Sequence, residues 1–258
     1  MENKVLTVCP YCGAGCRLYL VVEDGKIKRA EPAVGRTNEG ALCLKGYYGW
    51  DYLNDPKLLT PRIRKPKIRK NGKLEEVTWD EAISFTAKRL GEIRDKYGAD
   101  SIMGTGCSRG PGNEANYIMQ KFMRAVIGTN NVDNCARVCH GPSVAGLAKV
   151  LGNGAMSNSI PEIDNADLLF IFGYNPAESH PMVARRIVKA RQKGAKIVVV
   201  DPRVTESVRI SDLWLPIKGG TNMALVNSFA NVLINEGLYN KDYVEKYTEG
   251  FDEYIKVI

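Results

Sequence analysis

The amino-acid sequence predicts an α/β fold with largely parallel sheets. A pattern of helix, short strand, glycine-rich loop and helix occurs around residues 79–126 and recurs more clearly after residue 160. In that second half, two apolar strands end at residues 172 and 200, which are 28 residues apart, the length of one parallel βαβ unit. Hydrophobic residues make up 44% and charged residues 25% of the 258 residues, as in globular proteins with a substantial core.

The first elements are a hairpin and a capped helix. Asn71-Gly72 is typical of a type I′ turn, and alternation around it predicts a hairpin with Lys and Arg on a solvated face. Seven of the twelve residues 62–73 are basic, so a nucleic-acid arm is the alternative, and we favour the hairpin. Thr78 and Glu81 form a capping box that predicts a helix ending at Gly98.

A short strand at 101–103, a glycine-rich loop at 104–112 and a helix through Val126 follow. In the second half we expect strands at 167–172, 196–200 and 213–215. The second-half helices are expected at 182–193, closed by Gly194, and after the Gly219–Asn222 entry.

We expect three regions along the chain. They are a small N-terminal domain at 1–60, a first α/β region at 61–135 that is incomplete, and a second α/β region at 136–258. An apolar helical face from Phe251 to Ile258 reaches the C-terminus without a stop signal, so we expect a fragment of a longer chain.

Charge and hydropathy limit the compartment and the kinds of partner expected for the protein. The net charge is +7, which is compatible with nucleic acid, an anionic membrane face or an anionic ligand. No apolar run approaches the ~18 residues of a membrane span, and the opening residues have neither a twin arginine nor an apolar signal region. We therefore expect a cytoplasmic protein without a direct membrane span. Nucleic acid is not expected as a partner, because the basic segment 62–73 is better explained as a hairpin.

Four cysteines at the N-terminus are the sharpest chemical signal. Cys9, Cys12 and Cys16 lie in one loop and Cys43 lies far along the chain, a layout unsuited to a secreted disulfide framework. Four thiolates bind either tetrahedral zinc or an iron–sulfur cube. Zinc sites tend to use two separate knuckles, whereas three cysteines in one loop can wrap three corners of a cube, so the spacing favours [4Fe-4S].

The carboxyl ends of the second-half strands form a candidate nucleotide site. Ligands of parallel α/β sheets bind beyond these ends, where residues 173–179, Asp201-Pro202-Arg203 and the 219–222 helix entry lie. They offer an Asp for sugar or base donors, an Arg for phosphate and glycine N–H groups at a helix N-terminus. Asp-Pro-Arg after a strand can equally be a simple turn, and both interpretations stay open.

A last cluster lies between the two α/β halves. Cys139 is followed by His140, one of only two histidines in the chain. Arg137 and the helix expected after Pro142 would favour a thiolate at Cys139, as a metal ligand requires. The alternatives are a buried structural thiol and a structural histidine.

Together these segments resemble a known family. Residues 9–16 (CPYCGAGC), 43–46 (CLKG), 130–133 (NNVD) and 135–143 (CARVCHGPS) resemble the catalytic, or alpha, subunit of molybdenum or tungsten formate dehydrogenases. The cysteine motif alone is typical of the wider molybdopterin oxidoreductase superfamily, and CHGPS indicates the formate branch. The resemblance implies a small iron–sulfur domain followed by two Rossmann-like αβα regions.

The resemblance also implies roles for individual residues. Cys9, Cys12, Cys16 and Cys43 would hold a [4Fe-4S] cluster, with Lys45 between the cluster and one pterin. Cys139 would ligate the metal, in the place where some members carry selenocysteine, and His140 would handle the proton. The expected contacts to a bis(molybdopterin guanine dinucleotide) are Lys45, Arg109, Asn175, Glu178, Ser179, Asp201, Arg203 and Asn222.

The implied reaction is reversible oxidation of formate to CO2 at molybdenum or tungsten. Electrons would leave through the cluster to a partner subunit, an iron–sulfur protein or a flavoprotein. A formate-orienting arginine is expected beyond Ile258. The alternatives are a formylmethanofuran dehydrogenase-type subunit, a nitrate-reductase relative, which ranks lower, and a non-catalytic iron–sulfur or zinc binding module.

Overall fold

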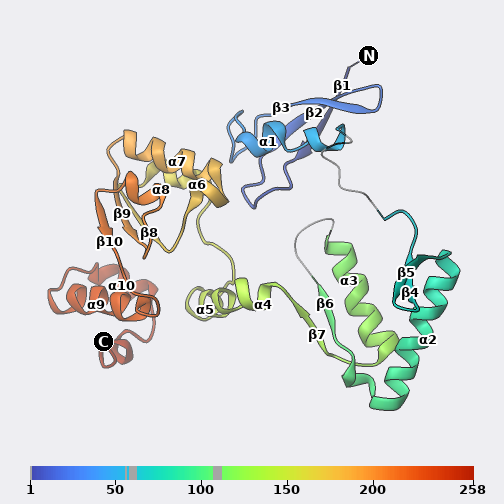
Figure 1. Ribbon diagram of the computed structural model, residues 1–258. Helices are drawn as coiled ribbons and strands as arrows, with labels where there is room; N and C mark the ends of the chain where they lie inside the picture. The colour runs from blue at the N-terminus through green and yellow to red at the C-terminus, as the bar shows by residue number, and fades with distance from the viewer. Residues whose placement is uncertain (1, 56, 58–62, 107–111) are drawn as a thin grey trace. The chain divides into compact units, whose positions relative to one another are not determined.

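The computed structural model describes residues 2–55, 57, 63–106 and 112–258 (Figure 1). Contacts within the chain divide it into two compact units. The first contains the residues up to Tyr11, then Gly15–Val34 and Gly40–Ser159, and the second contains Cys12–Ala14, Gly35–Glu39 and Ile160–Ile258. None of the described helices is both long and apolar enough to cross a membrane.

An antiparallel three-stranded sheet opens the first unit. Its strands β1 (Asn3–Val8), β2 (Arg17–Glu23) and β3 (Lys26–Pro32) are ordered β1-β2-β3. The β2–β3 turn has Asp24 and Gly25 at φ 49° and 72°, the left-handed pair that suits a tight hairpin. Leu18 and Val21 of the central strand are fully buried and form the core of this sheet. The short helices α1 (Leu44–Tyr48) and η1 (Asp51–Leu53) follow.

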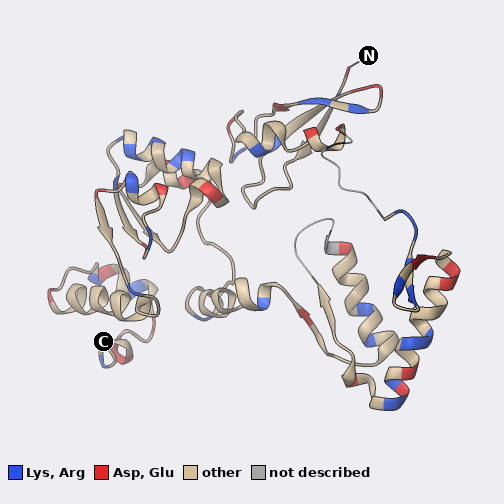
Figure 2. Ribbon diagram, in the orientation of Figure 1, with Lys and Arg blue, Asp and Glu red and all other residues tan. Residues whose placement is uncertain are grey.

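The predicted hairpin is confirmed. Strands β4 (Lys67–Lys70) and β5 (Lys73–Glu76) pair antiparallel around Asn71 and Gly72, whose φ values are 50° and 81°. Figure 2 shows the basic positions of β4 beside the acidic end of β5 and the start of α2. Lys70 Nζ lies 2.7 Å from a Glu81 oxygen, so part of the basic charge is neutralised within the chain.

The predicted helix and its Thr78 cap are also confirmed. Helix α2 (Trp79–Tyr97) begins where the Thr78 hydroxyl accepts a hydrogen bond from the Glu81 backbone N–H at 3.2 Å, and it ends at Gly98. The next turn, η2 (Ala99–Ser101), occupies part of the range in which the sequence predicted a strand.

The strand predicted at 101–103 is wrong in position. Strand β6 is Gly104–Gly106, and it pairs in parallel with β7 (Val132–Asn134), which the sequence analysis did not predict. The reason is close packing by the following helix. A Cβ atom at Gly104 would lie 3.1 Å from Met123 Sδ and 3.3 Å from Met119 Sδ, so only a residue without a side chain fits there.

The predicted helix after this strand is confirmed. It consists of α3 (Gly112–Phe122) and the π-helical turn η3 (Met123–Ile127), and it ends at Gly128 with φ 89°. Of the glycine-rich loop predicted at 104–112, residues 104–106 form β6 and residues 107–111 lie outside the described residues. Helices α4 (Ala136–Cys139) and α5 (Gly141–Leu151) complete this part of the chain.

The second unit contains a parallel sheet, as predicted. Strands β8 (Leu168–Phe172), β9 (Lys196–Val200) and β10 (Leu213–Leu215) are ordered β10-β9-β8 and all pair in parallel. Ile197, Val199 and Val200 of the middle strand are fully buried, as expected for a strand covered on both faces.

One helix covers one face of this sheet, and a second helix touches the other face. Helix α7 (Pro181–Gln192), which confirms the helix predicted at 182–193, packs on one face and contributes Val183 and Ile187 to a core with Ile171, Ile197 and Val199 (Figure 1). The opposite face is contacted by α9 (Asn222–Asn235), where the rings of Phe170 and Phe229 are 5.5 Å apart. The remaining elements are η4 (Ile160–Asn165), α6 (Pro176–Ser179), α8 (Glu206–Arg209), α10 (Lys241–Tyr247) and α11 (Phe251–Ile255).

Candidate functional site

Two of the candidate cluster ligands flank a closed loop. Cys9 follows β1 and Cys16 precedes β2, and the Cys9 N–H donates to the Cys16 carbonyl at 2.9 Å. Both are buried, with 8% and 5% of their surface exposed. Gly15 has φ 65°, a conformation that glycine adopts without strain, and it lets the chain return from the loop into β2. The antiparallel sheet therefore fixes the two ends of the cysteine loop.

Cys43 lies at the N-cap of α1. Its carbonyl accepts hydrogen bonds from the N–H groups of Gly46 at 2.9 Å and Tyr47 at 3.1 Å, so the helix holds the backbone of this half-buried thiol. Lys45 is in the first turn of the same helix and is half-buried. The helix therefore carries the predicted ligand and the predicted lysine two residues apart.

Tyr11 links the cysteine loop to the end of α1. Its hydroxyl donates to the Gly49 carbonyl, and its ring packs edge-on against Trp50 at 6.4 Å. Burial raises the pKa of Tyr11, with smaller contributions from Tyr52 and Cys9. The tyrosine therefore stays neutral and can serve as a hydrogen-bond donor between the two segments.

The donor chemistry of these residues fits an iron–sulfur cluster. None of the six described cysteines is in a disulfide, and Cys9, Cys12, Cys16 and Cys43 are all buried or half-buried. Such thiols suit a soft metal centre shielded from water. Among the described residues, no three His, Cys, Asp or Glu side chains are close enough to hold a metal ion. The assignment of all four thiols to one cluster therefore depends on the sequence and on the family comparison below.

Cys139 and His140 lie at the junction of α4 and α5. Both side chains are exposed, and His140 ends α4 and begins α5. The helix expected after Pro142 is confirmed, beginning at Gly141. The Arg137 side chain is paired with Asp133, since its Nε lies 3.2 and 3.1 Å from the two carboxylate oxygens. Hydrogen bonds from the Asn134 backbone N–H and from the Arg137 guanidinium hold the pKa of Asp133 below its usual range.

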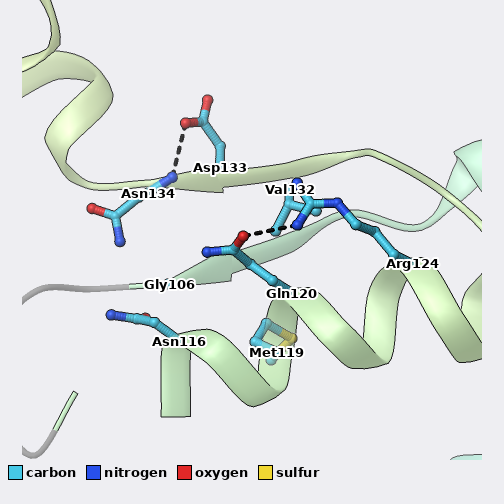
Figure 3. A pocket seen from close by; sticks show the side chains of 8 residues that line it. All are labelled: Gly106, Asn116, Met119, Gln120, Arg124, Val132, Asp133 and Asn134. Atoms are coloured by element: carbon cyan, nitrogen blue, oxygen red, sulfur yellow. Dashed lines mark hydrogen bonds between the residues drawn. The ribbon is translucent and has the colours of Figure 1, made fainter. Parts of the chain in front are cut away.

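The α4 turn starts directly from the ends of the parallel strands β6 and β7. The Cys135 N–H donates to the Gly106 carbonyl at 3.3 Å, and Asn134 caps the turn through a 2.9 Å bond from the Ala136 N–H. Beside it lies a cavity of about 160 Å³ (Figure 3). It is lined by Gly106, Asn116, Met119, Gln120, Arg124, Val132, Asp133 and Asn134. The reacting residues proposed from the sequence thus follow strand ends, where α/β proteins bind ligands.

Figure 3 shows why Gly106 is a glycine. The Asn116 side chain lies over it, and a Cβ atom at position 106 would collide with the Asn116 amide and lie 3.4 Å from Asn134 Nδ2. In the same view the Arg124 Nη1 donates to Gln120 Oε1 at 2.8 Å, which directs the guanidinium along α3. The absence of a side chain at 106 lets two amide groups approach the strand end.

The edge of the second sheet carries the predicted nucleotide-binding residues. Asp201 follows β9 and is 6% exposed, and its Oδ1 accepts the Arg203 N–H at 2.8 Å. The Trp214 indole donates to the Asp201 carbonyl at 2.9 Å. Asp201 thus organises a turn after β9, which was one of the two expected roles of this segment beside nucleotide binding. The Arg203 side chain is exposed.

Two buried polar atoms at this edge have no hydrogen-bond partner among the described residues. They are Asn175 Oδ1, after β8, and Thr205 Oγ1, after β9, and Thr205 is 5% exposed. Buried polar atoms are normally paired, so both fit contacts to a bound polar group. Asn175 was predicted from the sequence and Thr205 was not, because its one sequence signal is its position before the short α8.

The other predicted contacts are on the surface. Glu178 and Ser179 are exposed on α6, where Ser179 Oγ donates to the Asn175 carbonyl at 2.9 Å, and Asn222 is exposed at the start of α9. Arg109 lies outside the described residues.

A tyrosine–histidine pair in the second unit was missed. The Tyr174 hydroxyl lies 2.9 Å from His180 Nδ1, and that nitrogen lies 3.1 Å from Ser179 Oγ. Burial raises the pKa of Tyr174, and the charge of Cys12 adds to the effect. His180 is the second of the two histidines, which was the one signal available in the sequence.

Comparison with known proteins defines the family. A model described as molybdopterin oxidoreductase matches residues 62–253, and one described as molybdopterin oxidoreductase Fe4S4 domain matches residues 2–55. The chain belongs to the molybdopterin oxidoreductase family. The two matches imply an Fe4S4 cluster and a molybdopterin cofactor.

Individual relatives are similar over the whole chain. Formate dehydrogenase H of Escherichia coli K12 is 61% identical over 258 residues, covering 99% of this chain and 36% of that protein. The F420-dependent formate dehydrogenase 2 subunit alpha of Methanococcus maripaludis is 44% identical over 259 residues, which is 37% of its length. The solved structure of acetylene hydratase from Pelobacter acetylenicus matches with TM-score 0.76 and 27% identity over 99% of this chain and 35% of that one. The chain therefore spans little more than a third of each of these relatives.

Proposed function

We propose that the chain is part of a formate dehydrogenase catalytic subunit, which oxidises formate reversibly to CO2. The observation that carries this proposal is the 61% identity over 258 residues to a protein named formate dehydrogenase H, at a length that includes all the proposed site residues. Fold similarity alone is weaker support, because a solved structure with TM-score 0.76 is named a hydratase. The function therefore depends on the site residues.

The reaction converts formate to CO2, one proton and two electrons. When bound, the molybdenum or tungsten bis(molybdopterin guanine dinucleotide) and the [4Fe-4S] cluster would accept the two electrons and deliver them to a partner subunit. Cys139 would hold the metal through its thiolate, and the exposed position of this side chain at the end of α4 leaves it accessible to a cofactor. His140, the next residue, would take the proton on its imidazole.

Lys45 would act on electron transfer. It lies two residues after Cys43 on α1 and would place a cation beside the cluster that Cys9, Cys12, Cys16 and Cys43 hold. A nearby cation favours the more negative, reduced state of the cluster. The partner that receives the electrons would be an iron–sulfur protein or a flavoprotein, and the expected location is the cytoplasm.

The parallel sheet edge would hold one nucleotide end of the cofactor. The buried Asn175 Oδ1 and Thr205 Oγ1, which have no partner among the described residues, support this role. Glu178, Ser179, Arg203 and Asn222 would surround them, with Arg203 available for phosphate because its side chain is exposed. In this proposal the two α/β regions are Rossmann-like layers whose strand ends face the cofactor.

Metal analysis and activity test the proposal together. The protein is prepared anaerobically, and iron, molybdenum, tungsten and zinc are measured per chain, followed by formate-dependent reduction of a dye. Molybdenum or tungsten with about four iron atoms, and dye reduction that requires formate, are the expected results. Zinc alone would indicate a binding module, and iron without molybdenum or tungsten would indicate an electron carrier; either result would refute the proposal.

A further inference from the structure

The most deeply buried charge in the described chain has no part in the proposed chemistry. Arg186 on α7 is 1% exposed and is the largest of the fully buried side chains. A guanidinium stays charged at every physiological pH and is almost never buried unless it is paired. Its partners therefore show what its burial achieves.

Most of these partners lie in the segment 35–39. Arg186 Nε donates to the Thr37 carbonyl at 3.1 Å, and Nη2 donates to the carbonyls of Arg36 at 2.9 Å and Thr37 at 3.0 Å. Nη1 donates to Asp164 Oδ2 at 2.5 Å, and Nη2 lies 3.2 Å from Glu39 Oε1. The planar guanidinium thus binds two consecutive backbone carbonyls and two carboxylates, an arrangement that the single ammonium of a lysine cannot match.

The segment that Arg186 holds has an unusual conformation. Glu39 and Gly40 are both in the left-handed region, at φ 47° and 70°, and Glu39 is one of three described non-glycine residues with positive φ. A non-glycine residue keeps such a conformation only when its surroundings enforce it. Asn38 beside it is fully buried.

Charge from α7 enforces this turn at Glu39. Lys189 Nζ lies 2.6 Å and Arg185 Nη1 lies 3.6 Å from Glu39 Oε2, in addition to Arg186. Figure 2 shows these basic positions gathered along α7. The hydrogen bond from Lys189, and then the charges of Arg186 and Arg185, hold the Glu39 pKa below its usual range, so the carboxylate is ionised at neutral pH.

The turn leads directly to a predicted cluster ligand. Cys43 is four residues after Glu39, and the whole segment lies within residues 2–55 that match the Fe4S4 domain, although residues 35–39 cluster with residues 160–258. We propose that Arg186 is a positioning residue for the iron–sulfur centre: by binding the carbonyls of Arg36 and Thr37 and the carboxylate of Glu39, it fixes the turn from which the chain carries Cys43. This inference depends on the proposed role of Cys43 as a cluster ligand.

Three variants of the anaerobically purified protein, with its cofactors, test this role. Arg186→Met removes the guanidinium while keeping an unbranched side chain, and Arg186→Lys keeps the positive charge but lacks the planar fork. Arg185→Met is the matched control, since it removes a neighbouring cation whose ion pair with Glu39 is longer, at 3.6 Å. Amide hydrogen exchange of peptides covering 35–43 and 196–200 is measured, with iron per chain, the cluster EPR spectrum and the rate of cluster loss in air.

The expected results separate positioning from general stability. In Arg186→Met, amide exchange in 35–43 rises about tenfold or more while exchange in β9 stays unchanged. Cluster loss accelerates about 10- to 100-fold, as when a supporting partner of a metal ligand is removed, and the EPR signal broadens. Arg186→Lys gives intermediate values, and Arg185→Met stays close to the unaltered protein.

Several results would overturn the proposal. Exchange in 35–43 and cluster loss in Arg186→Met that equal those of Arg185→Met would show that the guanidinium does not fix the turn. Should Arg186→Met fail to fold, Arg186→Lys decides, and unaltered exchange and cluster retention in that variant would equally refute the role. Absence of iron from the unaltered protein would refute the cluster assignment. This failure can be told apart from failure of the Arg186 role, because the comparison of amide exchange requires no cluster.

Discussion

The proposed metal ligand can be removed with little effect on the fold. Cys139 is exposed at the end of α4, and the hydrogen bond recorded for its backbone, from its N–H to the Cys135 carbonyl at 3.3 Å, does not involve the thiol. Cys139→Ser exchanges sulfur for a smaller oxygen at a surface position. We therefore expect the free energy of unfolding to change by less than about 0.5 kcal/mol.

The effect on turnover should be far larger. A hydroxyl donates much less charge to molybdenum or tungsten than a thiolate does. Loss of a residue that merely supports a metal ligand lowers metal affinity or activity about 10- to 100-fold. Replacing the ligand itself should therefore lower the rate of formate-dependent dye reduction by more than about 100-fold. The iron–sulfur cluster should remain, because its four predicted thiols are elsewhere in the chain.

The chain offers a matched control for this experiment. Cys135 is a second exposed cysteine at the N-cap of the same short helix, four residues earlier. Cys135→Ser should keep turnover within about twofold of the unaltered enzyme and change the free energy of unfolding by a similarly small amount. Urea unfolding, iron content, cluster EPR and dye reduction are measured on both variants. Near-normal turnover in Cys139→Ser, or equal loss in both variants, would refute the assignment of Cys139 as the metal ligand.

Four further predictions follow from the site. His140→Ala should retain metal and lose about 10²- to 10⁴-fold in turnover, because a group that accepts a proton in the reaction contributes about that factor; metal analysis and steady-state dye reduction measure it. Lys45→Ala should allow formate to reduce the metal centre while electrons pass slowly to the dye, which rapid-mixing EPR resolves. Asp201→Ala should lower the pterin and metal content after purification, because the 2.8 Å bond to the Arg203 N–H that organises the sheet edge is lost. Gly49→Ala should lower the free energy of unfolding by about 1 to 3 kcal/mol, because the added Cβ would collide with the Tyr11 ring and the Lys45 carbonyl oxygen.

Each of these has an outcome that contradicts it. A His140→Ala enzyme with unchanged turnover would exclude the proton-accepting role, and equal slowing of both steps in Lys45→Ala would give that lysine another role. Full pterin and metal content in Asp201→Ala would leave Asp201 as a turn residue only. The control for Gly49→Ala is Gly91→Ala on α2, where a Cβ meets no atom within 4 Å and alanine should stabilise the helix by up to about 1 kcal/mol. An undiminished melting temperature in Gly49→Ala would contradict the predicted collision.

Elements defined by local signals could be predicted from the sequence. The Asn71-Gly72 turn requires positive φ at two consecutive residues, and the Thr78 cap requires only the Glu81 N–H three residues later. The three strands of the second sheet are apolar runs separated by a helix of the right length. The predicted cluster cysteines are also a local signal, since three of the four lie in one loop, and membership of the molybdopterin oxidoreductase family followed from the sequence as well.

The position of β6 could not be read from its own residues. Ile102 and Met103 are more apolar than Gly104-Thr105-Gly106, yet the glycines form the strand. Pairing with Val132–Asn134 and the approach of Met123 and Met119 decide the register. Both depend on residues that are at least 13 positions away along the chain, and no local propensity reports them.

The environment of Arg186 was decided entirely by tertiary structure. The chain has 36 Lys and Arg residues, and Arg186 is one of several on a predicted amphipathic helix. Nothing in the sequence distinguishes it from Arg185. The fold buries it and brings it to the carbonyls of residues 149 and 150 positions earlier. The same holds for the buried Asn175 Oδ1 and Thr205 Oγ1. Backbone carbonyls and unpaired oxygens carry no signature in the sequence, because every residue has a carbonyl, and only its surroundings determine whether water, protein or a ligand satisfies it.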